Sequence, residues 1–237
     1  MNQPRFYVEC PLSVGQQLPL PPAAAHHANH VLRLTVGDAV CLFNGEGGEY
    51  LGCLTECGKR QTIVQLNDHY SLDRAAPVYA HLGLCILKRE AMTAALARVT
   101  ELGACTITPL FSAYCTVPEK TARKRLEHWR KTVIAACEQC GLNKLPIVNE
   151  PCMLSDWVGA ARAKHVIGYI ALPEEVSIKP ETADCDFHLL VGPEGGFAAE
   201  EANQAVAAGF EPISLGDRTL RAETAPLVAL AMLMPLI

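Results

Sequence analysis

The chain has 237 residues, of which 50% are apolar and 19% are charged. This length and composition indicate a folded protein with one large or two modest domains, and they exclude a disulfide miniprotein and a mainly disordered chain. Twenty basic and 25 acidic residues give a net charge of −5, so bulk charge does not hold this protein to nucleic acid. Any polyanionic partner must therefore meet a local basic patch.

The 11 cysteines indicate a reducing compartment, because they are odd in number and are scattered from Cys10 to Cys185. No apolar signal segment precedes them, since Arg5 and Glu9 interrupt the first ten residues. We therefore expect a cytoplasmic protein. The longest apolar stretch, residues 225–237, contains two prolines and is shorter than the ~20 residues of a membrane helix, so we expect a core helix and no membrane partner.

The sequence does not predict a metal site. Cys137-x-x-Cys140 has no second cysteine or histidine pair at zinc-ligand spacing. His26, His27 and His30 lie close together, but no carboxylate or cysteine accompanies them at ligand spacing.

The first seventy residues consist of short β-favouring runs separated by turn residues, which predicts a small β-barrel. The expected strands are residues 5–10, 39–44, 50–55 and 61–67, and a short helix is expected over Ala23 to Leu34. A polar stretch that ends in proline, residues 71–77, is the candidate linker. We expect one domain over residues 1–72 and a second over residues 73–237.

After Pro77 the pattern changes to strands that alternate with helices, which predicts an α/β domain with a parallel sheet. Strands are expected at residues 78–86, 107–110, 165–170, 187–191 and 212–215. Helices are expected at residues 90–102, 119–140, 198–208 and 223–233.

Two polar and glycine-bearing loops follow successive strands of this second domain. The first reads Gly-Pro-Glu-Gly-Gly-Phe over residues 192–197, and the second reads Leu-Gly-Asp-Arg-Thr-Leu-Arg-Ala-Glu-Thr-Ala over residues 215–225. Open α/β sheets bind ligands beyond the carboxyl ends of their strands, so the two loops could share one crevice. Neither loop is a phosphate-binding Gly-Lys-Ser/Thr loop or a dinucleotide fingerprint. The alternatives are an ordinary glycine turn and a simple helix start at Glu223 and Thr224.

A basic segment interrupts the acidic background of the chain. Residues 118–131 contain six basic and two acidic residues, so they carry +4 while the remainder carries −9. This asymmetry suits a local contact with a polyanion, and a solvated helix face is the alternative.

The two loops resemble the RsmE family of 16S ribosomal RNA uridine-N3 methyltransferases when they are taken with three further motifs. These are Val-Thr-Glu-Leu-Gly over residues 99–103, Ala-Cys-Glu-Gln-Cys-Gly over residues 136–141, and His-Val-Leu-Arg over residues 30–33 followed by Gly37-Asp38. The resemblance spans essentially the whole chain. It implies an N-terminal PUA-like β-barrel, a C-terminal SPOUT α/β domain with a trefoil knot, S-adenosylmethionine as the cofactor, and a homodimer.

The resemblance also implies roles for individual residues. The cofactor pocket would comprise Ala171, Leu172, Gly192, Glu194, Gly195, Leu215, Gly216, Leu220 and Arg221. A bulky side chain at Gly195 is expected to block the approach of the ligand to the backbone. The Arg221 guanidinium is expected to stabilise the uracil anion through two parallel hydrogen bonds. Glu138 would remove the N3 proton or orient Arg221, and a structural helix carboxylate is the alternative role.

The expected substrate is 16S ribosomal RNA, within the small ribosomal subunit. Its phosphates would meet two groups of basic residues, namely Arg5 and Arg33 on the barrel and Arg123, Lys124, Arg125 and Arg130 on the basic helix. The chain departs from the family at Tyr114 and Leu142, where members commonly have arginine. Two alternatives stay open: a related knotted methyltransferase for another RNA position, and a non-catalytic RNA-binding or ribosome-assembly protein.

Overall fold

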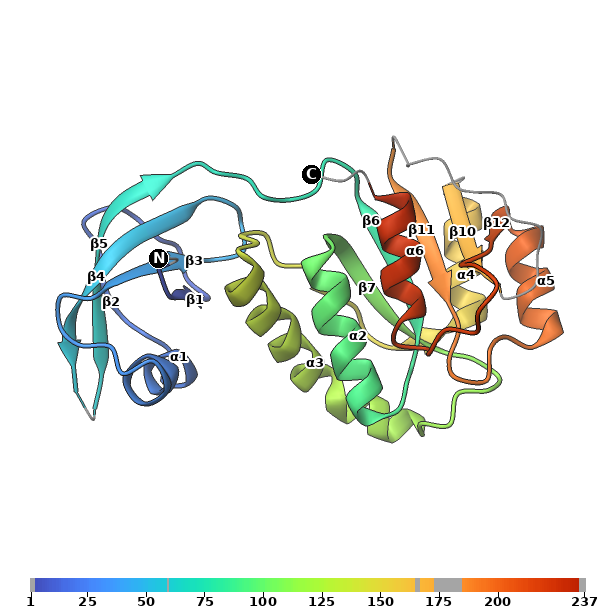
Figure 1. Ribbon diagram of the computed structural model, residues 1–237, viewed down its shortest axis with the longest axis horizontal. Coiled ribbons are helices and arrows are strands. Elements are labelled where there is room, and N and C mark those ends of the chain that lie inside the picture. Colours follow the sequence, from blue (N-terminus) through green and yellow to red (C-terminus); the bar gives the residue numbers. More distant parts are fainter. Residues whose placement is uncertain (1–2, 59, 165–166, 173–184, 235–237) are drawn as a thin grey trace. The chain divides into compact units, whose positions relative to one another are not determined.

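The computed structural model describes residues 3–58, 60–164, 167–172 and 185–234, and it divides the chain into two compact units (Figure 1). The first unit contains Met1–Ala75 and Cys137–Leu145, and the second contains Ala76–Ala136 and Pro146–Ile237. Residues 137–145 belong to the first unit because of contacts that no sequence pattern predicts. The backbone N–H of Tyr7 donates to Glu138, and the Lys144 ammonium lies 2.5 Å from the Asp73 carboxylate.

The first unit is built on a five-stranded mixed sheet, as the β-rich pattern predicts. Its strands are β1 (Arg5–Tyr7), β2 (Gln17–Pro19), β3 (Ala39–Phe43), β4 (Glu49–Cys57) and β5 (Thr62–Tyr70), in the order β1-β3-β4-β5-β2. Only the β1–β3 pairing is parallel. Apolar side chains from β3, β4 and β5, including Val40, Leu54 and Val64, form its buried core.

The helix predicted over residues 23–34 is shorter and less regular than expected. Its first part, α1 (Pro22–His26), is α-helical, and its second part, η1 (His27–Val31), is a π-helix. The chain then turns at Arg33, whose φ of +56° lies in the left-handed region and cannot continue a helix. The strand β2 was not predicted, because three residues carry too little alternation to stand out.

The second unit is an α/β domain whose main sheet is parallel, as predicted. Its strands run in the order β12-β10-β11-β6-β7-β8, and β9 also pairs with β7. The strands of this unit are β6 (Ala80–Cys85), β7 (Ala104–Phe111), β8 (Ile147–Val148), β9 (Cys152–Met153), β10 (Ile167–Ala171), β11 (Phe187–Val191) and β12 (Phe210–Ile213). Its helices are α2 (Arg89–Glu101), α3 (Glu119–Cys140), α4 (Leu154–Ala163), α5 (Ala199–Ala207) and α6 (Ala225–Leu233). The last residues of α3, from Cys137, belong to the first unit.

Helices cover both faces of this sheet, with α2 and α6 together on one face and α4 and α5 on the other (Figure 1). The α4 and α5 face buries Leu154, Val158 and Ala205 against strand residues such as Ile170 and Leu190. Helix α4 was not predicted.

No described helix is long and apolar enough to cross a bilayer. Residues 173–184 lie outside the described residues, and the trefoil knot stays a prediction.

A buried carboxylate holds two arginines together in the first unit. Glu49 begins β4, and its two oxygens lie 2.5 Å from Arg5 Nη1 and 3.0 Å from Arg74 Nη2. The side chains of Glu49 and Arg5 are only 11% and 9% exposed. Burial by itself would raise the pKa of the Glu49 carboxyl, but the hydrogen bonds and charges of both arginines outweigh it and lower the pKa below its ordinary value.

We predict that Glu49→Gln destabilises the first unit by about 3 kcal/mol at neutral pH, because it leaves the Arg5 charge buried without a partner. A lowered pKa in the folded state gives stability that is present above the unfolded pKa and is lost as the pH falls through the folded pKa. The difference from wild type should therefore shrink in acid. Hydrogen exchange of the β1 and β3 amides measures it. Equal protection of Glu49→Gln and of the exposed control Glu9→Gln at neutral pH would contradict this account.

Candidate functional site

A cavity of the second unit lies where three neighbouring parallel strands end. In the order β12-β10-β11, the chain moves from β10 to β11 on one side and later to β12 on the other. The carboxyl ends of these strands, Ile213, Ala171 and Val191, therefore lie at one edge. A reversal of strand order of this kind leaves a crevice between the two loops, and it is the usual ligand site of an open α/β sheet.

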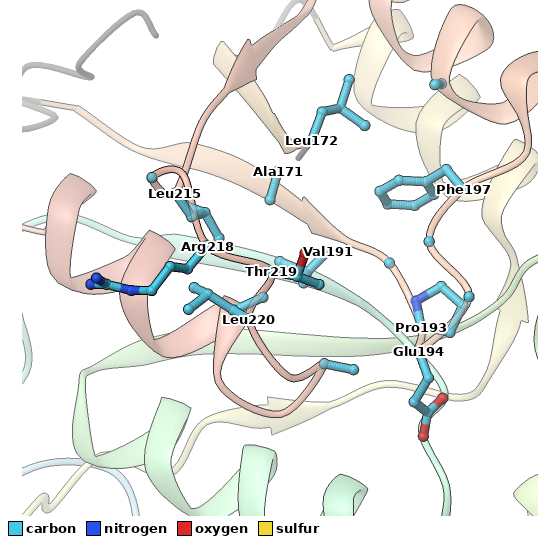
Figure 2. Close-up of a pocket in the computed structure, with 17 residues that line it drawn as sticks. Ala171, Leu172, Val191, Pro193, Glu194, Phe197, Leu215, Arg218, Thr219 and Leu220 are labelled. Atoms are coloured by element: carbon cyan, nitrogen blue, oxygen red, sulfur yellow. The ribbon is translucent and has the colours of Figure 1, made fainter. Parts of the chain in front are cut away.

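This first cavity has a volume of about 420 Å³. Its lining comes from the end of β10, from the loop after β11, from α5 and from the loop between β12 and α6 (Figure 2). The lining residues are Ala171, Leu172, Val191, Gly192, Pro193, Glu194, Gly195, Gly196, Phe197, Ala202, Leu215, Gly216, Arg218, Thr219, Leu220, Ala222 and Ala225.

The cavity combines apolar side chains with accessible backbone. Leu172, Phe197, Leu215 and Leu220 contribute apolar surface from different sides (Figure 2). At Gly216 the backbone has a φ of +103°, and a Cβ atom built there would have no neighbour within 4 Å. A ligand can therefore approach the main chain at this position, which a side chain would obstruct.

Two glutamates fix the loops around this cavity. Glu201, in the first turn of α5, accepts hydrogen bonds from the backbone N–H of Ala113 at 2.7 Å and of Ala198 at 3.0 Å. Glu194 turns its carboxylate away from Ala171 and Leu172 (Figure 2) and accepts the backbone N–H of Lys88 at 3.1 Å. The loop after β11 is thereby tied to the loops after β6 and β7.

The structure brings the residues predicted for the cofactor pocket together, with one exception. Ala171, Leu172, Gly192, Glu194, Gly195, Leu215, Gly216 and Leu220 all line the cavity. Arg221 does not line it, because its side chain is 85% exposed, with Glu223 as an ion-pair partner at 3.9 Å. Arg218 is the arginine of the lining. The other lining residues that sequence reasoning missed are Val191, Pro193, Gly196, Phe197, Ala202, Thr219, Ala222 and Ala225. Of these, only Ala202 lies away from the two motif loops and their flanks, and it carries no sequence signal.

The expected effect of a side chain at Gly195 needs a correction. A Cβ atom built at Gly195 would lie 3.0 Å from Cβ of Tyr114, so it would crowd a neighbouring loop of the protein. The close approach that requires glycine here joins two loops of the protein. Substitution at Gly195 would displace Tyr114 and would not test the cofactor pocket cleanly.

Glu138 has an observed structural role. It belongs to the first unit, where its carboxylate accepts the backbone N–H of Tyr7 at 3.0 Å. Burial raises the pKa of the Glu138 carboxyl, while the Tyr7 hydrogen bond acts in the opposite direction. Leu142 is also part of the first unit, and it is half-buried.

The two arginines predicted to bind RNA on the barrel differ in exposure: Arg5 is buried and Arg33 is exposed. Arg5 is not available to phosphate, because its guanidinium is buried and paired with Glu49. That expectation failed because the sequence does not reveal the Glu49 partner, which lies 44 residues away in the chain. Arg33 is exposed on the turn that follows η1.

The basic helix α3 presents its charges unequally. Arg123 pairs with Glu119 at 2.9 Å, and Arg130 pairs with Glu127 at 2.6 Å. Within the part of the chain that the structure describes, no carboxylate lies within 4.0 Å of the charged groups of Lys124 or Arg125. Lys124 is exposed and Arg125 is half-buried. Among the described residues, no three His, Cys, Asp or Glu side chains are grouped as metal ligands.

Comparison with known proteins identifies the family. The profile of an RNA methyltransferase domain matches residues 74–234, and that of an RNA methyltransferase PUA domain matches residues 20–67. The ribosomal RNA small subunit methyltransferase E of Buchnera aphidicola from Schizaphis graminum is 31% identical over 97% of this chain and 95% of its own length. This chain belongs to the methyltransferase E family.

Solved structures of similar proteins support the same assignment. A methyltransferase E from Neisseria gonorrhoeae, bound to S-adenosylmethionine, has a TM-score of 0.88 and 33% identity, and the match covers 97% of this chain and 96% of that one. A methyltransferase from Legionella pneumophila in complex with the same cofactor has a TM-score of 0.91 and 34% identity, with 98% and 96% covered. The methyltransferase E fold therefore extends over both units, a PUA-like domain followed by a SPOUT domain.

The residues of the first cavity fit S-adenosylmethionine. A volume of about 420 Å³ lies within the range of small-molecule sites, roughly 300–1,000 Å³. Leu172, Leu215 and Leu220 offer apolar contact to an adenine ring, and the open backbone at Gly216 offers polar groups to its edge. The site is thus assembled from the loops that the sequence motifs identified.

We predict that Ala171→Phe weakens S-adenosylmethionine binding at least tenfold, about 1.4 kcal/mol, because the ring fills the cavity from the end of β10. Ala171→Gly is the matched control, since it leaves the cavity open and should keep the affinity within about threefold. Isothermal calorimetry measures both, with circular dichroism as the check on folding. Wild-type affinity in a folded Ala171→Phe protein would exclude this cavity as the cofactor site.

Proposed function

We propose that this protein methylates N3 of a uridine in 16S ribosomal RNA of the small ribosomal subunit, with S-adenosylmethionine as the methyl donor. The observation that carries the proposal is the cavity at the ends of β10, β11 and β12, whose lining contains the two loops characteristic of the family. The similar structures from Legionella and Neisseria, both described with S-adenosylmethionine, support the choice of cofactor.

The reaction places specific demands on the protein. When bound, S-adenosylmethionine supplies an electrophilic methyl group on a positively charged sulfur. Uridine N3 becomes nucleophilic only after its imide proton is removed, and in a base pair that atom is not accessible. The protein must therefore hold the base outside its stack, and binding contacts must offset an unstacking cost of a few kcal/mol.

Arg221 is the residue we propose for stabilising the uracil anion. It follows Leu220 and precedes Ala222, which both line the first cavity, while its own side chain extends into solvent. An exposed guanidinium beside the cofactor site can meet an incoming base if it gives up its ion pair with Glu223, and such exposed pairs contribute only about 0–1 kcal/mol. Its two parallel donors match a carbonyl oxygen and an adjacent anionic nitrogen.

Proton removal by Glu138 stays a prediction. A raised carboxyl pKa suits a general base, but the hydrogen bond to Tyr7 already gives this carboxylate a structural function. The structural function explains the residue without any catalytic role. Glu138 is therefore a weaker candidate than Arg221.

RNA binding is proposed to involve α3 and Arg33. Among the residues that the structure describes, Lys124 and Arg125 have no carboxylate within 4.0 Å, so they can neutralise phosphates directly. Arg123 and Arg130 must exchange exposed carboxylate partners for phosphate, which is feasible because exposed ion pairs contribute only about 0–1 kcal/mol.

A homodimer in the cytoplasm is also part of the proposal. Helix α6 is almost entirely apolar, and Leu227, Val228 and Met232 on it are only half-buried within one chain. A second copy of the chain would cover such a surface. The remainder of the apolar C-terminal run, residues 235–237, lies outside the described residues. A ribosomal substrate implies the cytoplasm.

The direct test uses small ribosomal subunits isolated from cells that lack this protein. We predict that the purified protein and S-adenosylmethionine add one methyl group per subunit, and that nucleoside mass spectrometry identifies it as 3-methyluridine. A ribose-methylated nucleoside would instead support the reading as a methyltransferase for another position. Tight RNA binding with neither methylation nor cofactor binding would support the non-catalytic reading.

We further predict that Arg221→Lys lowers single-turnover methyl transfer by roughly 10²-fold, because lysine keeps the charge but loses the paired donors. Stability and S-adenosylmethionine affinity should change little, since the side chain is 85% exposed and outside the cavity lining. Arg98→Lys, on the exposed side of α2, is the control. A wild-type rate would show that Arg221 is not catalytic, whereas lost cofactor binding would make it a cofactor residue.

A further inference from the structure

A second cavity lies along the same edge of the sheet in the second unit. It has a volume of about 580 Å³ and is lined by Lys88, by residues 113–116, and by Glu194 and Gly195. These residues follow β6, β7 and β11, which are neighbouring parallel strands, so their loops emerge at one edge. The family motifs point to the first cavity, and only Glu194 and Gly195 belong to both.

The loop after β11 is therefore a wall common to the two cavities. Its Gly195 backbone faces Tyr114, because a Cβ atom built there would lie 3.0 Å from Tyr114 Cβ. Its Glu194 carboxylate is bonded to the backbone of Lys88. A methyl group is transferred only when its acceptor contacts it directly, and two cavities of suitable size meet at this loop, whose residues line both.

Tyr114 gives the second cavity an aromatic surface on an ordered loop. The residue is 52% exposed, so it is accessible to a ligand. The loop around it is fixed by the Ala113 N–H bond to Glu201 and by the Cys115 N–H bond to the Ser112 carbonyl at 3.0 Å. An accessible aromatic ring held on an ordered loop is the usual platform for stacking an unpaired base.

Lys88 adds positive charge to the same cavity. It is exposed at the N-terminal end of α2, and among the described residues no carboxylate lies within 4.0 Å of its ammonium group. An aromatic surface together with a cation matches a nucleotide, because a nucleotide has a flat base and a negatively charged phosphate. The hydroxyl of Thr116 is a further group that can bond the edge of a base.

We propose that this second cavity receives the target nucleotide of the RNA. The pyrimidine base would stack on Tyr114, and the phosphate of the nucleotide would face Lys88. The inference rests on the proposed function and assigns the acceptor half of that site. It makes Tyr114 a substrate-binding residue. It places the base beside the loop of Glu194 and Gly195, which lines both cavities. There N3, after its proton has passed to a general base, would attack the sulfonium methyl directly, the carbon–sulfur bond would break, and S-adenosylhomocysteine would leave.

The test compares methylation of small subunits by Tyr114→Ala, Tyr114→Phe and Tyr79→Ala. Loss of one base–aromatic stack should raise KM for the subunit about tenfold or more in Tyr114→Ala, while Tyr114→Phe keeps the ring and stays within about twofold of wild type. Tyr79, which is 46% exposed before the amino end of β6, is the matched control. S-adenosylmethionine affinity should remain at the wild-type value in all three variants.

A second measurement does not depend on turnover. RNA that carries 4-thiouridine at the methylated position should form a photo-crosslink to the peptide that contains residues 113–116. An unchanged KM in Tyr114→Ala, or a crosslink confined to other peptides, would overturn the inference while wild-type methylation continued to support the proposed function. Failure of the wild-type protein to methylate the subunits would contradict the proposed function itself.

Discussion

The parallel pairing of five neighbouring strands is the constraint on which the rest of the second unit depends. Because β12, β10, β11, β6 and β7 run in one direction, every loop that follows them emerges at the same edge of the sheet. The reversal of strand order at β10 opens the first cavity there. The second cavity follows from the same arrangement, since the loops after β11, β6 and β7 are adjacent.

Glu194 and Glu201 fix the positions of these neighbouring loops through hydrogen bonds. Glu194 joins the loop after β11 to the start of α2, and Glu201 joins the loop after β7 to the start of α5. Each carboxylate accepts backbone N–H groups near a helix N-terminus, a position that favours negative charge. The loops that line both cavities are therefore held by the framework of the domain, as a site that aligns two substrates requires.

The sequence predicted the second unit well where its patterns are long and local. The strands around residues 80–85 and 187–191 and the helix over 119–140 have strong periodicity, and the two motif loops identified most of the first cavity. Short elements such as β2 and β8 were missed. The burial of Arg5 and the contact of Glu138 with Tyr7 were missed because both depend on partners far away in the chain. Single-sequence patterns carry no information on such pairings.

The residues of the second cavity could not be predicted from sequence patterns either. Tyr114 and Lys88 lie 26 positions apart in the sequence and follow different strands, and neither belongs to a glycine-bearing motif. Only the sheet order brings them to Gly195 and Glu194. The donor side of the site was therefore predictable from motifs, whereas the acceptor side required the fold.

A crystal structure of this protein with bound S-adenosylmethionine tests the central claim most directly, because the claim concerns which side of the first cavity faces the acceptor. The account predicts adenosine between Leu172, Leu215 and Leu220, with the sulfonium methyl directed at the wall of Glu194 and Gly195. A methyl group directed away from that wall, or a cofactor bound outside the first cavity, would contradict it.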